Sequence, residues 1–262
     1  MHPILKHPLL RPLRVAYSAR RHPAGFVLLW LFRGRSIHVY DVGAHFGNTT
    51  EKYANWFPSA SFDMFEADPT IADLCKRRML PAPRVRLHTF ACGDTNGTAV
   101  FHCTAPANDV DGGFEGGASG SLLEPSGIST HFPHVVFQKS IEVQVRRLDT
   151  WIEESGTPPP AFLHLDVQGA EMLVLNGLGI HFNAIEAVWL EVENQELYAN
   201  QPLKPDIESF FVSRGWTKVV DTVGTVYGDQ LWVNPASFHK LRGWGWKFHK
   251  TWYSPVFQKL EG

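Results

Sequence analysis

The residues with the clearest chemical meaning form a turn, Asp41-Val-Gly-Ala-His-Phe-Gly-Asn-Thr49, between an apolar run and a helix-like run. A strand, a tight glycine turn and a helix in this order present the backbone of an α/β domain to a nucleotide-like ligand. Gly43 and Gly47 let a ligand approach the main chain closely. Asp41 stands where a dinucleotide site has its first glycine, and a carboxylate there would repel a pyrophosphate. The turn therefore favours a cationic nucleoside over a dinucleotide.

S-adenosylmethionine (SAM) is such a ligand, because it carries an ammonium and a sulfonium group. The turn therefore predicts SAM rather than NAD. The residues that we predict to bind it lie at this turn and behind later strands of the chain: Asp41, Gly43, Ala44, His45, Gly47, Glu66, Ala91, Cys92, Asp94 and Asp166.

Two acids in this set have specific expected partners. Glu66 is expected to accept the ribose hydroxyls, as an acid at the end of the second strand does in nucleotide-binding folds. Asp68 directly precedes Pro69 and is the expected cap of the following helix, which leaves Glu66 for the ligand. Asp94 fits two roles equally well, an acceptor for the adenine amino group and a residue of the turn with Asn96-Gly97.

Further ionisable groups follow two later apolar runs, at the edge where parallel strands bind ligands. Asp166 is expected at the tip of one strand, near the reactive end of the ligand, and Glu191 at the tip of the next. His164 lies two residues before Asp166, on the same strand face but deeper, where a base and a satisfied core histidine are equally good interpretations. Asp166, His164 and Glu191 are our candidate catalytic residues, as base or ligand.

A divalent metal is an alternative at the same edge. Asp166, Glu191, Glu193 and Asn194 would supply oxygen ligands only, the donor set of Mg²⁺. Glu191 and Glu193 share a face of their strand because side chains alternate. The rival hypothesis has no metal and uses a carboxylate or a histidine as the base.

The elements that must position these residues extend from about residue 36 to residue 234. Apolar runs and alternating patterns predict strands at Ile37–Val42, Ser61–Glu66, Arg84–Phe90, Thr98–Cys103, Ile141–Val145, Phe162–Val167, Ala187–Val192, Trp216–Asp221 and Asp229–Asn234. Helices are expected at Thr50–Phe57, Pro69–Met79, Leu148–Glu154, Gly169–Leu175 and Pro205–Arg214. This alternation predicts an α/β fold with a mostly parallel sheet and helices on both faces.

Composition excludes some functions. A net charge of −2 over 262 residues gives no general attraction to nucleic acid. The 3 cysteines lack a CxxC spacing, so neither a disulfide framework nor a zinc site is expected, and a reducing cytoplasm fits. The oligomeric state cannot be inferred from the sequence.

Two extensions flank the predicted domain, residues 1–35 and residues 235–262. The first is basic and contains Phe26-Val-Leu-Leu-Trp-Leu-Phe32, which is far too short to span a bilayer. We expect this run to pack on the core, and the alternative is peripheral contact with an anionic inner membrane face. The second extension mixes basic and aromatic residues, and docking onto the sheet is again the favoured interpretation.

Several motifs in order resemble the FkbM family of SAM-dependent methyltransferases between about residues 36 and 234. They are Asp41-Val-Gly-Ala-His-Phe-Gly47, Phe65-Glu-Ala-Asp-Pro69, Ala91-Cys-Gly-Asp94, Arg147-Leu-Asp-Thr-Trp151 and Leu163-His-Leu-Asp-Val-Gln-Gly-Ala-Glu171. The resemblance implies a class I methyltransferase fold with a seven-stranded sheet. It also implies O-methylation, with sugars, glycans or polyketide-like natural products as acceptors. Gln168 departs from the family, which usually has a glutamate there.

Two other functions compete with a SAM-dependent O-methyltransferase. An NAD-type oxidoreductase is disfavoured because the turn lacks the first glycine. A SAM-binding or interaction protein without catalysis is disfavoured because acids are retained at several strand ends.

Overall fold

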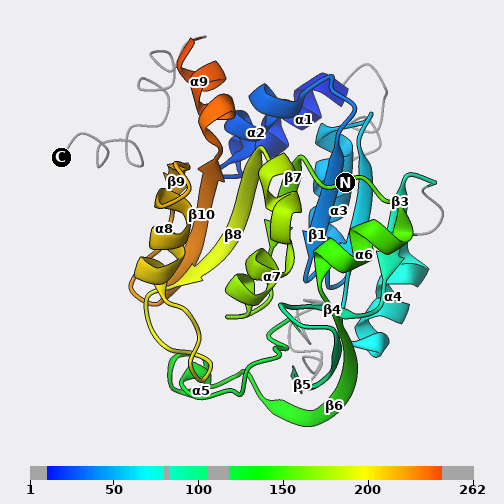
Figure 1. Ribbon diagram of the computed structural model, residues 1–262, viewed down its shortest axis with the longest axis vertical. Helices are drawn as coiled ribbons and strands as arrows, with labels where there is room; N and C mark the ends of the chain where they lie inside the picture. The colour runs from blue at the N-terminus through cyan, green and yellow to red at the C-terminus, as the bar shows by residue number, and fades with distance from the viewer. Residues whose placement is uncertain (1–10, 80–82, 105–117, 244–262) are drawn as a thin grey trace.

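The computed structural model describes residues 11–79, 83–104 and 118–243. A seven-stranded sheet in the order β3-β2-β1-β7-β8-β10-β9 forms its centre (Figure 1). The strands are β1 (His38–Val42), β2 (Ser61–Phe65), β3 (Val85–His88), β7 (Phe162–Leu165), β8 (Ala187–Glu193), β9 (Thr217–Asp221) and β10 (Tyr227–Val233). β10 runs antiparallel to β8 and β9, whereas the pairs from β3 to β8 are parallel. The expected class I methyltransferase architecture is confirmed.

Helices cover both faces of this sheet. One face packs against α1 (Arg11–Arg20), α2 (Gly25–Phe32) and α3 (Asn48–Trp56). The other packs against α6 (Leu148–Ser155), α7 (Glu171–Gly177) and α8 (Lys204–Val212). The remaining helices are α4 (Pro69–Met79), α5 (Ile128–His131), a 3₁₀ turn at Gly179–Ala184 and α9 (Pro235–Gly243). β7 is therefore buried throughout, which is why its sequence is an unbroken apolar run apart from His164.

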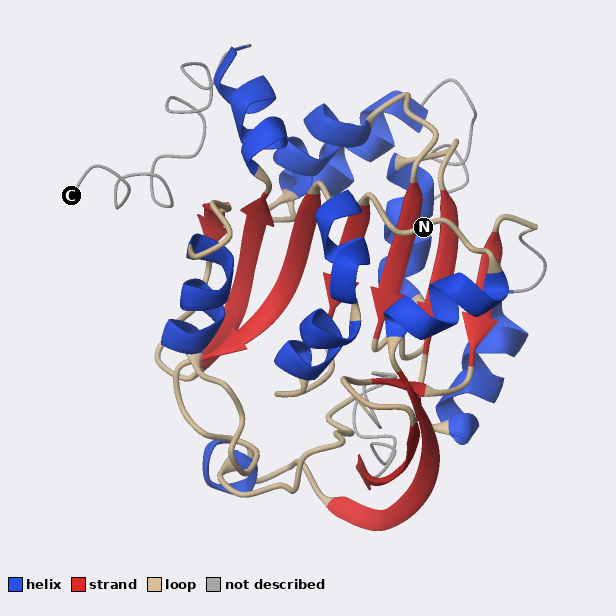
Figure 2. Ribbon diagram, in the orientation of Figure 1, coloured by secondary structure: helices blue, strands red, loops and turns tan. Residues whose placement is uncertain are grey.

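A second, three-stranded sheet lies beyond the carboxyl ends of the central strands (Figure 2). It consists of β4 (Ala91–Cys92), β6 (Phe137–Arg146) and β5 (Gly97–Thr104), with β5 and β6 antiparallel. The expected strand Arg84–Phe90 is thus shorter, because the chain leaves the main sheet after β3 and pairs with β6. The expected strand Ile141–Val145 is part of the longer β6.

The first extension packs on the domain in its described part. Val27, Leu28, Leu31 and Phe32 of α2 are buried in the same apolar cluster as Trp56 of α3. This contact confirms the expectation that the apolar run packs on the core. In the described ranges, every helix is too short or too polar to cross a membrane. Of the second extension, α9 lies within the described residues and buries Leu241.

Helix starts follow the local sequence. Asp68 accepts a hydrogen bond from the Thr70 N–H at 2.7 Å, so it caps α4 as expected. Pro69 is the first residue of that helix, where its missing N–H costs nothing. The cap leaves Glu66 at the end of β2.

Candidate active site

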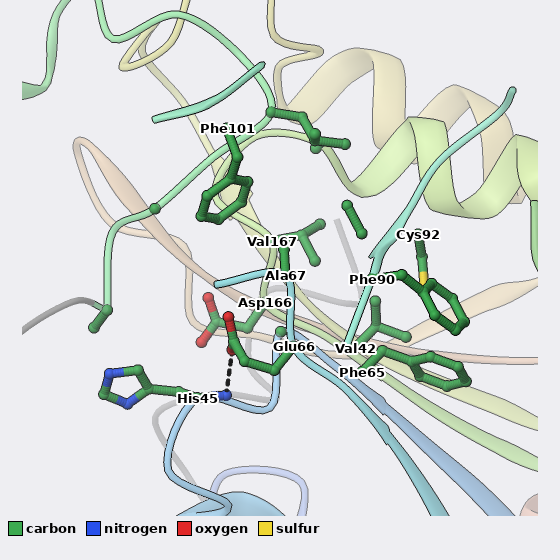
Figure 3. A pocket seen from close by; sticks show the side chains of 16 residues that line it. Val42, His45, Phe65, Glu66, Ala67, Phe90, Cys92, Phe101, Asp166 and Val167 are labelled. Atoms are coloured by element: carbon green, nitrogen blue, oxygen red, sulfur yellow. Dashed lines mark hydrogen bonds between the residues drawn. The ribbon is translucent and has the colours of Figure 1, made fainter. Parts of the chain in front are cut away.

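A pocket opens at the carboxyl ends of β1, β2 and β7 (Figure 3). This is where ligands bind in open parallel sheets. Its walls come from the β1–α3 turn, the ends of β2 and β7, and the second sheet with the loop after it. They comprise Val42, Gly43, His45, Phe65, Glu66, Ala67, Phe90, Ala91, Cys92, Phe101, Ala118, Gly120, Leu122, Asp166, Val167 and Ala170.

The glycine turn after β1 is constrained by its protein neighbours. The N–H groups of Gly43 and Ala44 both donate to the Phe65 carbonyl, at 3.0 Å. Gly43 has φ +81°, and a β-carbon there would lie 1.8 Å from the Asp166 carbonyl oxygen. A glycine is therefore required so that the ends of β1 and β7 can approach each other. His45 also has a positive φ, 49°, and its side chain lines the pocket.

Asp41 lies within β1 and is fully buried. Its carboxylate accepts hydrogen bonds from Thr50 Oγ1 at 2.5 Å and from His164 Nδ1 at 2.7 Å. Burial alone would lower the pKa of His164, but the adjacent Asp41 carboxylate raises it overall. Neither residue is among those that line the pocket. The structure thus places both in a buried pair, which is the core arrangement that we kept as the alternative for His164.

Glu66 is fixed on the pocket wall by the backbone around it. Its Oε2 accepts the His45 N–H at 2.8 Å (Figure 3). Its Oε1 accepts the Asp68 N–H at 2.9 Å. Burial raises the pKa of Glu66 to about 7, because the two backbone hydrogen bonds offset the loss of solvation only in part. Each oxygen keeps a lone pair for a further donor.

The remaining predicted cofactor residues divide into two groups. Ala91 and Cys92 line the pocket, as do Gly43, His45, Glu66 and Asp166. Ala44, Gly47 and Asp94 do not, and the Asp94 carbonyl instead accepts a hydrogen bond from Arg147 at 2.6 Å.

Sequence reasoning missed the apolar side of the pocket. Phe65 and Phe90 lie together on one wall, and Phe101 comes from β5 of the second sheet (Figure 3). These are ordinary core residue types, and no sequence signal distinguished them. Only the fold of β5 back over the strand ends brings Phe101 to the site.

Acidic side chains continue from the pocket along the ends of β7, β8 and β10. Asp166 is exposed after β7, while Glu191 in β8 is directly opposite Asp229 in β10. Burial and repulsion from Asp166 raise the pKa of Glu191, and the same two causes raise that of Asp229 to about 6. Asp229 belongs to this group although the sequence did not single it out as a site residue.

Two more buried acids, Glu193 and Glu171, lie near Asp166 and Glu191. Glu193 is 1% exposed, and its Oε1 has no hydrogen-bond partner among the described residues. Glu171 begins α7 and accepts the Val167 N–H at 3.0 Å. Burial, with repulsion from neighbouring acids, raises the pKa of both carboxyls. This edge of the sheet therefore concentrates carboxyls whose ionised forms are disfavoured.

The four proposed metal ligands do not converge on an ion. The Gln168 amide nitrogen donates to Asp166 Oδ1 at 2.9 Å and to Glu191 Oε2 at 2.6 Å. The Asn194 amide nitrogen donates to the Gly224 carbonyl at 2.5 Å. Throughout the described residues, no group of three or more His, Cys, Asp or Glu side chains is arranged to hold a metal. The donor atoms are those that Mg²⁺ prefers, but their arrangement in the described part of the chain does not form a site for the ion.

Comparison with known proteins gives consistent likenesses. The family model described as "Methyltransferase FkbM domain" matches residues 41–217. A curated protein, 2-O-methyltransferase NoeI of Sinorhizobium fredii (strain NBRC 101917 / NGR234), is 34% identical over 167 residues, which cover 63% of this chain and 68% of that protein.

Similar solved structures include a methyltransferase FkbM from Methylobacillus flagellatus KT, with a TM-score of 0.47 and 12% identity. The alignment covers 86% of this chain and 59% of that one, so this chain spans less than two thirds of its length. A precorrin-6y C5,15-methyltransferase from Geobacter metallireducens GS-15 has a TM-score of 0.42 and 10% identity, over 89% of this chain and 93% of that one.

Proposed function

This chain belongs to the FkbM family of methyltransferases, and from that premise we propose that it transfers the methyl group of SAM to a hydroxyl group of a sugar, a glycan or a polyketide-like natural product. One observation carries the proposal. A single pocket has a buried acid at the end of β2, Glu66, and an exposed acid at the end of β7, Asp166. The two acids match the two tasks of such an enzyme, which are to bind the nucleoside and to receive a proton.

The pocket residues fit SAM by their chemistry. Glu66 is oriented by two backbone N–H groups and can accept the ribose hydroxyls with its remaining lone pairs. The apolar wall with Phe90, Ala91 and Phe101 suits the adenine ring. Asp166 offers a negative charge to the cationic end of the ligand.

When bound, SAM supplies an electrophilic methyl group. The protein must align an acceptor oxygen with that group and remove the hydroxyl proton as the new C–O bond forms. Asp166 is our first candidate base because it lines the pocket and is exposed to an incoming acceptor. Glu191 is the second, since one amide group links it to Asp166. His164 is a weaker choice, because its Nδ1 is engaged by Asp41 in the core.

A hydroxyl acceptor is supported by the relative named as a 2-O-methyltransferase. The acids beyond the pocket also suit an acceptor with several hydroxyl groups, because carboxylates accept hydrogen bonds from each of them. The cytoplasmic location and the division at residues 35 and 235 stay predictions, and contact of the extensions with a membrane stays an alternative.

The test is methyl transfer from labelled SAM to a panel of monosaccharides, oligosaccharides and phenolic or polyketide hydroxyls. We expect label in an acid-stable ether product of at least one sugar or polyketide acceptor, together with calorimetric binding of SAM. Binding of SAM with no transfer to any hydroxyl would overturn the acceptor assignment and favour a non-catalytic SAM-binding protein. Binding of NAD in place of SAM would overturn the whole proposal.

A further inference from the structure

Gln168 occupies a central position between the acids of the site. Its side-chain amide donates one hydrogen bond to Asp166, at 2.9 Å, and one to Glu191, at 2.6 Å. The Tyr198 hydroxyl lies 3.1 Å from Gln168 Oε1 and 3.0 Å from the Ser119 carbonyl, and its one proton can donate to either acceptor. The two carboxylates thus fix the NH₂ group of Gln168, and the Tyr198 hydroxyl lies beside its carbonyl oxygen.

The backbone at Gln168 is held in an unusual conformation. Its φ is +56°, in the left-handed region that a residue with a side chain adopts at a cost. The Ser121 hydroxyl donates to the Gln168 carbonyl at 2.8 Å, and Ser121 is fully buried. Tyr198, also fully buried, fixes the other end of the residue. The surroundings thus hold this side chain at a strained position, as is typical of functional sites.

The Gln168 amide is a neutral hydrogen-bond donor among acidic side chains. The groups that surround Asp166 and Glu191 are mostly acids, namely Glu171 on α7, Glu193 on β8 and Asp229 on β10, with the Tyr198 hydroxyl beside them. The cations nearby are Lys52 and His164, which both act on Asp229, and His164 also interacts with Asp166. A neutral group that donates two hydrogen bonds stabilises the ionised form of both carboxylates without adding charge.

We propose that Gln168 is a positioning residue whose amide holds the Asp166 and Glu191 carboxyl groups together, ready to take the acceptor proton, and that the Tyr198 hydroxyl beside its Oε1 contributes to the orientation of this amide. The proposal rests on the proposed function for the identity of the proton donor. The hydrogen bonds that carry it do not depend on the acceptor. Gln168 acts through its neighbours and is not assigned contact with the reacting atoms.

The first test compares Gln168→Glu with Gln144→Glu, which adds the same charge to an exposed position of β6. Gln168→Glu replaces a donor by a third carboxylate, so like-charge repulsion should raise the pKa of the base. With the acceptor found in the panel, we expect the acid limb of the kcat profile to move up by about one pH unit or more. Gln144→Glu should leave the profile unchanged.

Two further variants separate the donor from the charge. Gln168→Met keeps the approximate length but removes both hydrogen bonds, and it should lower kcat about tenfold while the Kd for SAM stays within about twofold. Tyr198→Phe removes the hydroxyl that contacts both Gln168 Oε1 and the Ser119 carbonyl and leaves the two hydrogen bonds of the amide in place, so a smaller loss of kcat is expected. Wild-type kcat and pH profiles in both Gln168 variants would overturn the proposal.

A second measurement needs no acceptor. The pH dependence of urea unfolding between pH 5 and 8 reports protons bound on folding. Gln168→Glu should bind up to one more proton when folded than Gln144→Glu, so its stability should fall more steeply as pH rises. Equal slopes would overturn the role of Gln168. If the panel yields no acceptor but the slopes differ, the proposed function fails and the role of the amide stands. If Gln168→Glu does not fold, Gln168→Met and Tyr198→Phe decide the outcome.

Discussion

The central sheet contains carboxyl groups whose pKa values are shifted in opposite directions, downward for Asp63 and upward for acids at the strand ends. In the middle of β2, Asp63 is fully buried and accepts hydrogen bonds from His38, His88 and Arg86, with 2.6 Å to His88 and 2.8–2.9 Å to Arg86. Burial alone would raise the pKa of Asp63, but these three partners outweigh it and hold the pKa well below its usual range. At the ends of β7, β8 and β10, burial and mutual repulsion instead raise the pKa values of Glu191 and Asp229.

From this difference we infer that Asp63 stabilises the fold and propose that the acids at the strand ends serve a ligand. A buried charge with matched partners is ionised and fixes the register of its neighbours, although the pair need not add net stability. Buried acids without matched cations destabilise the fold when ionised, and a sequence retains them where chemistry requires them. Asp63 lies away from the pocket lining, whereas Asp166 is part of it.

The largest expected effect concerns Asp63, the buried carboxylate with matched hydrogen-bond partners. Asp63→Ala should lower the free energy of unfolding by about 3–5 kcal/mol, because it leaves the largely buried His38 and His88 side chains without their carboxylate. Urea unfolding at pH 7 measures this, with Asp73→Ala on the exposed face of α4 as control. Methyl transfer per folded molecule should stay near the wild-type value. A loss of less than about 1 kcal/mol would show that Asp63 is not the centre of its network.

The next prediction concerns Asp166, one of the acids at the strand ends. Asp166→Asn should lower kcat about 10²–10³-fold, the range for loss of a general base, because an amide cannot take the proton. Unfolding measurements should show no loss of stability, since an exposed charge among like charges is removed. A kcat within twofold of wild type would transfer the role of base to Glu191.

A smaller effect is expected for Glu66, the acid that we propose to bind the ribose of SAM. Glu66→Gln should raise the Kd for SAM about tenfold in calorimetry, which corresponds to roughly one hydrogen bond to a charged group. Because burial raises the pKa of Glu66 to about 7, wild-type affinity should also increase as pH rises through 7 and the carboxylate ionises. Unchanged affinity in the variant, or a flat pH profile, would remove Glu66 from the SAM site.

The smallest predicted effect is a contrast in the pH dependence of stability. Asp63 has a lowered pKa, so its contribution is present above about pH 4 and is lost as pH falls below that value. Asp229 has a pKa of about 6, above its unfolded value, so stability should fall as pH rises from about 4 to 6.

Asp229→Asn should remove that fall, which we expect to be about 1 kcal/mol or less because the group is only partly buried. Urea unfolding at pH 4, 5, 6 and 7 measures it, and the Asp63 contribution should be constant over the same range. If the free energy of unfolding changes with pH in the same way for Asp229→Asn and wild type, Asp229 is not among the acids that repel one another at the strand ends.

The sequence by itself determined the alternation of strands and helices, and with it the parallel sheet. It also placed Gly43, Glu66 and Asp166 correctly on one edge of the sheet, because the carboxyl ends of parallel strands gather there. The motif order that resembles the FkbM family led to the same fold and to methyl transfer. These conclusions rest on patterns within a few residues, which local backbone preferences and strand polarity are sufficient to fix.

Only the tertiary structure decided the partners of these residues. Asp41, expected to face the ligand, pairs with His164, which is 123 residues away in the chain. Gln168 bridges to Glu191, and Asp63, which no pattern indicated, meets His38 and His88 from neighbouring strands. The physical reason is that strand order and register bring distant side chains into contact, and the local sequence of one strand carries no record of which residue the next strand will place beside it.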